Sequence, residues 1–265
     1  MTGVTDLLLL AGMGLAAGLV GCFAVMRKMT LASDAMAHVA LPGIGLALLL
    51  HLHPLLGAAA MLLVGTLVIW VVESRAGIAT ETVIGVVFSS ALAIGGLFTE
   101  GEELIDALFG KPGTLSTPET IFGIAASAAV TLFVVTQRHR LVIRLVSRDL
   151  ARTSGIDAAR LDLLLLSMFS LTVALGLRYL GVLLMGSLII IPAATAKHLA
   201  TGLTAMLAIA PTLAVVTTLL GTVTAHAVQR ESGPVIIALA AAVFFVSLLF
   251  KWKARPIAAG RARRL

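Results

Sequence analysis

The chain has 265 residues, of which 59% are hydrophobic and only 12% are charged, and its mean hydropathy is +1.08. Water-soluble domains carry about 25% charged residues, so this composition excludes a soluble globular protein and indicates a polytopic membrane protein surrounded by membrane lipid. The basic residues behind the formal net charge of +6 gather in short stretches, which favours a topological role over nucleic-acid binding. The single cysteine, Cys22, excludes an intrachain disulfide.

Nine apolar segments are candidates for crossing a bilayer, which takes roughly 20 residues of helix. They cover residues 7–26, 34–52, 55–73, 83–99, 120–136, 161–179, 181–199, 203–225 and 234–250. The region 161–199 can also be taken as one broken hairpin, which leaves eight spans. The predicted fold is therefore all-α, a polytopic transmembrane helical bundle of about nine spans. No loop is long enough for a separate soluble domain, so 1–265 is expected to form a single transmembrane domain.

The distribution of charge predicts the orientation of these spans. Arg27 and Lys28 follow the first segment, six arginines lie within 137–160, and the tail from Lys251 carries six basic residues and no acidic one. Acidic residues predominate in 100–119. Because short cytoplasmic loops are enriched in Lys and Arg, a nine-span arrangement places the N-terminus outside and the C-terminus inside.

Asp34 and His38 stand at the start of the second segment, in MTLASDAMAHVALPG. Side chains four residues apart share one face of a helix, with Cβ atoms about 5–6 Å apart. A carboxylate and an imidazole form half of a ligand set for zinc, manganese or iron, and ionisable groups within membrane spans are candidates for function. The alternatives are a simple hydrogen-bonded pair, or Ser33 or Asp34 as a helix N-cap.

Two prolines interrupt apolar segments, Pro42 in VALPGIG and Pro192 in IIIPAATA. A proline inside a membrane helix frees a backbone carbonyl and bends the helix, and such helices often line a substrate route. The alternative is a bend that neighbouring helices tolerate. Gly14 and Gly18 indicate close helix packing in the first segment. The sequence assigns no role to three histidines near the predicted outer ends of the segments: His51, His53 and His226.

The basic loop 137–160 contains VSRDLARTSGIDAAR, which predicts a short polar helix, a stop at Gly155 and a second helix start at Asp157. Such a helix either docks a partner protein or lies on anionic lipid, and composition leaves both open. No phosphate-binding loop of the form G-x-x-x-x-G-K-[ST] occurs, so the chain is not expected to hydrolyse ATP by itself. Motifs of membrane proteases are missing as well, so we expect no enzyme.

Six stretches along the chain together resemble one family. They are GLVGCFAVMRKMTLASDAMAHVALPGIGLA, TETVIGVVFSSALAIGGLF, ALFGKPGTLS, RDLARTSGID, GVLLMGSLIIIPAATA and SGPVII. In this order they are similar to the membrane permease subunits of ATP-binding-cassette importers for zinc, manganese and iron, over nearly the whole chain. Zinc and manganese members share these motifs, so the resemblance does not identify the metal.

The resemblance implies a homodimeric permease in the cytoplasmic membrane of a prokaryote. Its expected partners are two cytoplasmic ATPase subunits and an extracellular or periplasmic metal-binding protein. The divalent ion, zinc or manganese, is cargo, and no permanently bound cofactor is expected. Asp34 and His38 then fall on the metal route, where two copies of the helix would bring together two aspartates and two histidines. The residues of RDLARTSGID that the resemblance assigns to coupling with the ATPase are Asp149, Ala151 and Gly155.

One alternative function uses the same residues differently. In an ion-coupled secondary transporter or channel, working without an ATPase, Asp34 and His38 would carry protons. Uptake in vesicles with and without the ATPase distinguishes this class from an ATP-driven importer.

Overall fold

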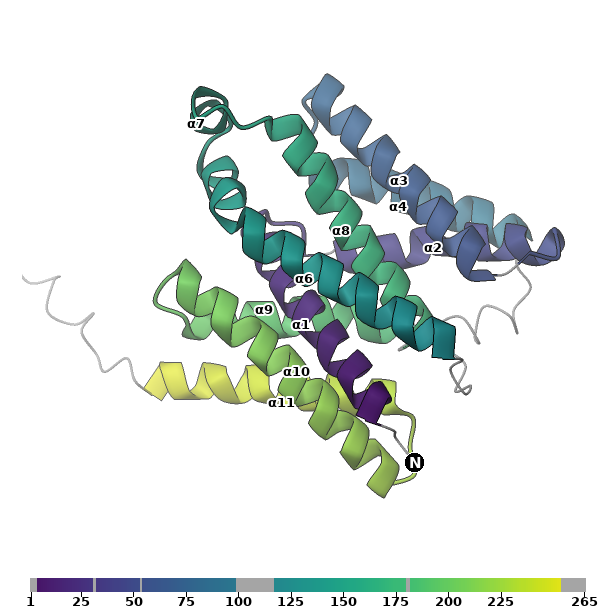
Figure 1. The fold of residues 1–265 in the computed structure, drawn as a ribbon, viewed down its shortest axis with the longest axis vertical. Coiled ribbons are helices and arrows are strands. Elements are labelled where there is room, and N and C mark those ends of the chain that lie inside the picture. Colours follow the sequence, from purple (N-terminus) through teal and green to yellow (C-terminus); the bar gives the residue numbers. More distant parts are fainter. Residues whose placement is uncertain (1–3, 31, 53, 99–116, 180–181, 254–265) are drawn as a thin grey trace, which may run out of the picture.

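The computed structural model describes residues 4–30, 32–52, 54–98, 117–179 and 182–253 (Figure 1). Within these ranges every regular element is a helix, which confirms the predicted all-α class. The helices are α1 (Val4–Met26), α2 (Ala32–Leu49), α3 (Pro54–Ala76), α4 (Thr80–Phe98), α6 (Thr117–Val146), α7 (Arg148–Thr153), α8 (Ala158–Tyr179), α9 (Val182–Leu199), α10 (Leu203–Ala227) and α11 (Ser232–Lys253).

Each predicted span falls on one long helix, and the region of the broken-hairpin alternative holds two helices, α8 and α9. Seven of the described helices are long and apolar enough to cross a membrane by length and composition. Two more, α4 and α9, have shorter apolar stretches, Thr80–Gly95 and Leu184–Leu199. These helices indicate a multi-pass membrane protein, whereas the count of nine spans and the orientation stay predictions.

Helix α6 is longer than its apolar segment predicted. It runs on through Gln137 and the basic residues that follow it, to Val146. The segment 137–146 contains no glycine or proline, so nothing in it interrupts a helix that has already formed. Half of the basic loop is therefore a helical extension that carries its arginines to the base of α7.

Helix α1 passes through the middle of the molecule, against α6, α9 and α10 (Figure 1). Glycines make this close packing sterically feasible. A Cβ atom on Gly18 would lie 2.5 Å from the Cα of Pro211 in α10, and one on Gly14 would lie 3.1 Å from the backbone of Val215. Small residues let membrane helices approach closely, so the packing predicted from Gly14 and Gly18 is confirmed.

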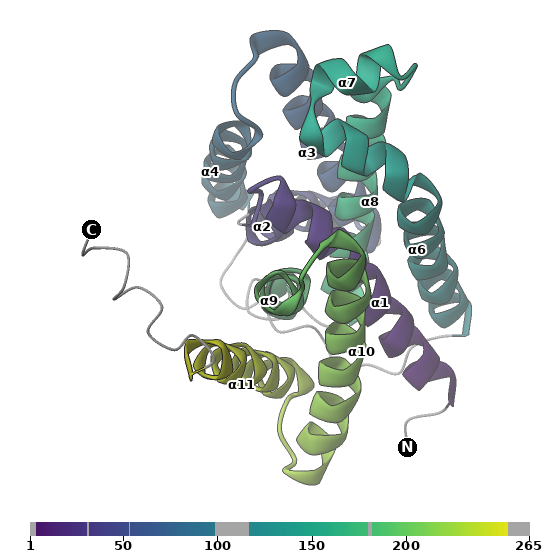
Figure 2. The same ribbon diagram turned by 90° about the vertical axis from the view of Figure 1, so that its left-hand side faces the viewer.

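Helices α2, α3 and α4 form a second group, seen apart from α10 and α11 in Figure 2. A Cβ atom on Gly43 of α2 would lie 2.2 Å from the carbonyl oxygen of Gly57 in α3, and one on Gly57 would lie 2.0 Å from the carbonyl oxygen of Gly43. The two backbones therefore touch at this point. Since no side chain fits between them, movement of α3 at this crossing cannot be absorbed by side-chain rearrangement before it reaches α2.

Candidate functional site

Asp34 and His38 lie in the first two turns of α2. His38 Nε2 is 3.9 Å from Asp34 Oδ1, which is too long for a hydrogen bond. Two ligand atoms about 2.1 Å from one ion lie about 3.4 Å apart at the tetrahedral angle, so a small side-chain rotation would bring this pair to the spacing of a shared cation. The Asp34 side chain is 53% exposed and that of His38 is 21% exposed. The carboxylate is thus open to an ion or to a second chain.

Neither alternative for this pair describes the structure. Ser33 and Asp34 both lie inside α2, which begins at Ala32, so neither is its N-cap. The Ser33 hydroxyl instead donates to the carbonyl oxygens of Thr30 at 3.3 Å and Gly186 at 3.4 Å. A carboxylate in the first turn is favourable beside the positive end of the helix dipole. Asp34 is therefore stabilised locally while its side chain stays free to bind.

Neighbouring helices hold the pair in place. A Cβ atom on Gly186 of α9 would lie 3.5 Å from the Cα of Asp34, so the backbone of α9 passes close to the start of α2. The ring of Phe88 in α4 meets the His38 ring edge-on, with centroids 5.6 Å apart. The His38 Nδ1 atom is buried and has no hydrogen-bond partner among the described residues. The imidazole is thus oriented by packing, and the sequence did not single out Gly186 or Phe88.

The described part of one chain provides two side-chain ligands at this site, Asp34 and His38. Among the described residues, no cluster of three or more His, Cys, Asp or Glu side chains could hold a metal ion. A structural metal site would need four protein ligands, so the pair by itself is a half-site. The remaining ligands have to come from water, backbone carbonyls or another chain.

The prolines expected to break helices lie within continuous helices. Pro42 is buried inside α2 and Pro192 is buried inside α9, and both helices continue beyond them. Because proline has no N–H, Pro42 cannot donate to the carbonyl of His38 one turn earlier. A backbone oxygen beside the Asp34–His38 pair is thereby released from the helix ladder. That these prolines line a path stays a prediction.

The basic loop forms the helix, stop and second helix that its sequence predicted. Ser147 caps α7, because its hydroxyl accepts a 3.3 Å hydrogen bond from the N–H of Leu150. At the other end, the N–H of Gly155 bonds to Arg152 O and that of Ile156 bonds to Ala151 O, at 3.1 and 2.9 Å. Gly155 has φ +71°, so this is a Schellman C-cap, in which glycine is strongly favoured.

Side chains of this loop divide into inward and outward groups. Ala151 is completely buried, whereas Asp149 is exposed and Leu150 is 48% exposed. Asp157 then begins α8, since its carboxylate accepts a 3.1 Å hydrogen bond from the N–H of Arg160. Helix α7 is consequently anchored by Ala151 and presents Asp149 and Leu150 away from the bundle.

Beneath α7 lies a group of five charged side chains that the sequence did not reveal. We call Arg27, Glu73, Arg144, Arg148 and Asp162 the ionic cluster. They come from the α1–α2 turn and from α3, α6, α7 and α8, so the cluster joins five parts of the chain. Residues so far apart in sequence carry no local signal of pairing. The one sequence signal related to this cluster was the excess of arginine on the predicted cytoplasmic side.

Its two carboxylates are shared among three arginines. Asp162 is 3% exposed and contacts Arg27 at 3.0 Å, Arg144 at 2.5 Å and Arg148 at 3.6 Å. Glu73 is 8% exposed and contacts Arg27 at 3.6 Å and Arg148 at 3.5 Å. Buried carboxylates require such partners, because an unpaired charge away from water is strongly unfavourable.

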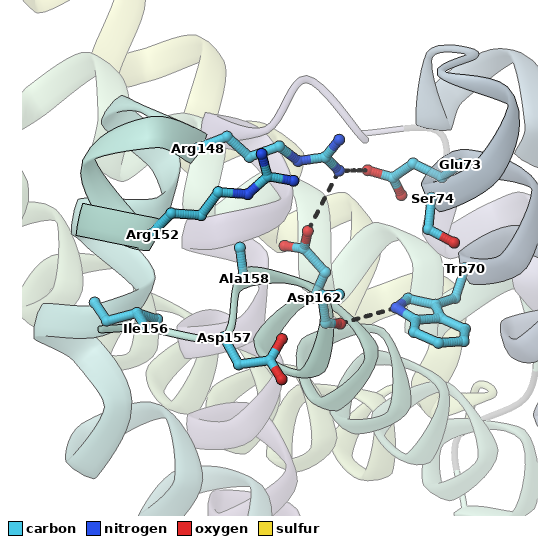
Figure 3. Close-up of a pocket in the computed structure, with 10 residues that line it drawn as sticks. Trp70, Glu73, Ser74, Arg148, Arg152, Ile156, Asp157, Ala158 and Asp162 are labelled. Carbon is cyan, nitrogen blue, oxygen red and sulfur yellow. Dashed lines mark hydrogen bonds and ion pairs between the residues drawn. The ribbon is translucent and has the colours of Figure 1, made fainter. Parts of the chain in front are cut away.

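A pocket of about 210 Å³ opens between α7, α3 and the start of α8 (Figure 3). Arg148 crosses it to reach Glu73 and Asp162, and Trp70 Nε1 donates a 2.8 Å hydrogen bond to Ala159 O on its far side. The pocket residues are Trp70, Glu73, Ser74, Arg148, Arg152, Ile156, Asp157, Ala158, Ala159 and Asp162. Among the described residues, Arg148 is thus the only pocket side chain that connects α7 to both Glu73 and Asp162 through ion pairs.

Comparison with known proteins places this architecture in one family. Residues 5–251 match the ABC 3 transport family. The chain belongs to the ABC 3 transport family.

Relatives and a solved structure agree with this membership. The chain is 28% identical over 246 residues to the manganese import system permease protein ScaB of Streptococcus parasanguinis, covering 91% of this chain and 88% of the relative. It is 30% identical over 252 residues to the zinc transport system membrane protein TroC of Treponema pallidum, covering 89% and 85%. The structure of PsaBC from Streptococcus pneumoniae in complex with Fab aligns with a TM-score of 0.77 at 28% identity, covering 91% and 89%.

Membership of the ABC 3 transport family makes this chain a membrane transport protein.

Some of its predicted features cannot be placed: the motif ALFGKPGTLS and His53 lie outside the described residues. His51 is exposed in the turn after α2, and His226 is exposed in the last turn of α10. Their roles stay unassigned.

Proposed function

We propose that this protein is the permease subunit of an ATP-driven importer that moves a divalent transition metal ion, manganese or zinc, across the cytoplasmic membrane. The observation that carries the proposal is the Asp34–His38 pair. An open carboxylate and a packed imidazole lie 3.9 Å apart on one helix of a chain in the ABC 3 transport family. Relatives named for manganese import and for zinc transport support both metals.

The half-site supports a homodimer. Two copies of α2 facing one another would bring two carboxylates and two imidazoles to one ion, which is a complete set of oxygen and nitrogen ligands. The 53% exposure of the Asp34 side chain in a single chain leaves it available for such a shared site. A transport site must also release its ion, and a set without thiolate ligands suits the borderline divalent metals without holding them permanently.

Energy for transport is assigned to a separate ATPase. The chain has no phosphate-binding loop, and α7 presents Asp149 and Leu150 outward while Ala151 anchors it. We assign α7 and the Gly155 turn to docking on the ATPase, with one ATPase for each of two permease copies. An extracellular or periplasmic metal-binding protein would deliver the ion to the opposite face. This arrangement requires the nine-span topology with the C-terminus inside.

Uptake in proteoliposomes tests the proposal. The permease is reconstituted with and without its ATPase, with the metal-binding protein supplied on the opposite face from the ATPase. Uptake of radioactive manganese and of zinc is then measured with ATP or with an imposed proton gradient. We expect uptake only when ATPase and ATP are both present. Uptake driven by the gradient alone would overturn the proposal in favour of a secondary transporter.

A further inference from the structure

The two buried carboxylates of the ionic cluster join the docking helix to the segment that leads into the metal pair. Arg148, the first residue of α7, reaches Glu73 at 3.5 Å and Asp162 at 3.6 Å. Arg27, in the turn before α2, reaches the same two carboxylates at 3.6 and 3.0 Å. Glu73 and Asp162 therefore bridge two arginines that belong to opposite ends of the proposed transport machinery.

The segment between Arg27 and α2 is short and internally bonded. The N–H of Met29 donates to Ala24 O at 2.8 Å, and the N–H of Ala32 donates to Met29 O at 3.0 Å. Asp34 follows in the first turn of α2. Because the segment between Arg27 and α2 is so short, a displacement of Arg27 is expected to move the start of α2.

A second route to α2 runs along α3. Glu73 lies near the C-terminal end of α3, and Gly57 near its other end touches Gly43 of α2 backbone to backbone. A helix transmits a displacement along its length, and a backbone contact leaves no soft side chain to absorb it. Glu73 is thus connected to α2 along α3 as well as through Arg27, and Asp162 is connected to it through Arg27.

The cluster is also able to exchange partners. Three arginines share two carboxylates, while Arg27 Nη1 and Glu73 Oε2 are buried with no hydrogen bond to any residue that the structure describes. A fully saturated network would have one favoured arrangement, but this one holds an unused donor and an unused acceptor. Arg148, whose side chain is 43% exposed, can shift with α7 while Arg27 stays paired with the two buried carboxylates. Such bistable elements are what switching requires.

We propose that the ionic cluster transmits the movement of α7 to α2, with Glu73, Asp162, Arg148 and Arg27 acting as positioning residues that link ATP hydrolysis to the geometry of the Asp34–His38 pair. The inference rests on the proposed function, because it needs an ATPase docked on α7 and a metal bound at α2. It adds a defined connection between those two places.

The test measures metal uptake and ATP hydrolysis in the same proteoliposomes, with the permease–ATPase complex, the metal-binding protein on the opposite face, and manganese and zinc in turn. Glu73→Gln keeps the size of the side chain and removes its charge. We expect the number of ions imported per ATP hydrolysed to fall by about tenfold or more, because both Arg148 and Arg27 lose a buried partner. Assembly with the ATPase, measured by co-purification, should persist because α7 itself is unchanged.

The matched control is Arg160→Gln. Arg160 pairs with Asp157 at 3.0 Å close to α7, but its side chain is 84% exposed. Exposed ion pairs contribute little, so the import-to-hydrolysis ratio should equal that of the unmodified complex. Arg148→Gln provides a second variant that leaves the Arg27–Asp162 and Arg144–Asp162 pairs intact, so it keeps the test decisive if Glu73→Gln does not fold. Arg148→Lys should recover part of the ratio.

The outcomes separate the two proposals. If the unmodified complex and Arg160→Gln import metal with ATP, and the cluster variants hydrolyse ATP with little import, the transmission role is supported. If assembled Glu73→Gln or Arg148→Gln keeps the normal ratio, or loses import and hydrolysis in equal proportion, the transmission role is overturned while the proposed function stands. If the unmodified complex imports no metal with ATP, the proposed function fails and this inference fails with it.

Discussion

Arg27 and Asp162 lie 3.0 Å apart, although one follows the first helix and the other belongs to α8. Their contact ties the turn before the Asp34–His38 pair to α8, the helix that follows α7. Asp162 is 3% exposed, so the pair is shielded from water and from salt. Asp162 therefore stabilises the fold, apart from any role in coupling.

We expect Asp162→Asn to destabilise the protein strongly. Arg144 would lose its carboxylate partner, while Arg27 and Arg148 would keep Glu73. Breaking a buried pair typically costs about 3–5 kcal/mol. Thermal unfolding of the purified protein in detergent should show a clear fall in Tm. Arg160→Gln should shift stability by no more than about 0.5 kcal/mol, because its ion pair is exposed. An unchanged Tm in Asp162→Asn would mean that the cluster contributes nothing to stability.

A second prediction concerns the crossing of α2 and α3. Gly57→Ala would place a Cβ atom 2.0 Å from the carbonyl oxygen of Gly43, so the helices must separate. We expect lower stability and reduced metal uptake, because α2 carries the Asp34–His38 pair. Gly85→Ala is the control, since a Cβ atom on this α4 glycine meets nothing within 4 Å. Equal uptake by the two variants would show that the tight crossing is dispensable.

Local chemistry accounts for what the sequence predicted well. The end of α7 at Gly155 and the start of α8 at Asp157 depend on residues within one turn, so their sequence pattern was sufficient. The spacing of Asp34 and His38 likewise follows from helix geometry. Helix α6 was predicted too short because hydropathy marks the apolar part of a helix and not its polar extension.

Long-range contacts account for what the sequence did not predict. Glu73 and Asp162 stand at the ends of apolar segments, where carboxylates are usually solvated, and only the fold brings three arginines to them. The same applies to Phe88 and Gly186, which reach the Asp34–His38 pair from α4 and α9. A pairing between distant helices has no periodicity along the chain, so a single sequence could not reveal it.

Asp34→Ala and His38→Ala should each abolish most metal uptake while leaving membrane insertion normal. Each removes one of the two side-chain ligands in a chain, and therefore two of four in the proposed dimer site. Uptake of radioactive manganese or zinc in the reconstituted complex measures the effect. His226→Ala, at an exposed position in the last turn of α10, serves as the control. Normal uptake by Asp34→Ala would remove the pair from the metal route.

The turn after α7 allows a test of docking separate from the test of transmission. Gly155 has φ +71° and a Cβ atom there would meet nothing within 4 Å, so Gly155→Ala adds only backbone strain of about 1–2 kcal/mol. That strain loosens the Schellman cap, and we expect weaker binding of the ATPase in a pull-down titration. Gly77→Ala is closely matched, because Gly77 has φ +64° and equally open surroundings in the α3–α4 turn. Both variants should lose similar stability, but only Gly155→Ala should lose ATPase affinity. Equal ATPase binding by both would place docking elsewhere than on α7 and its cap.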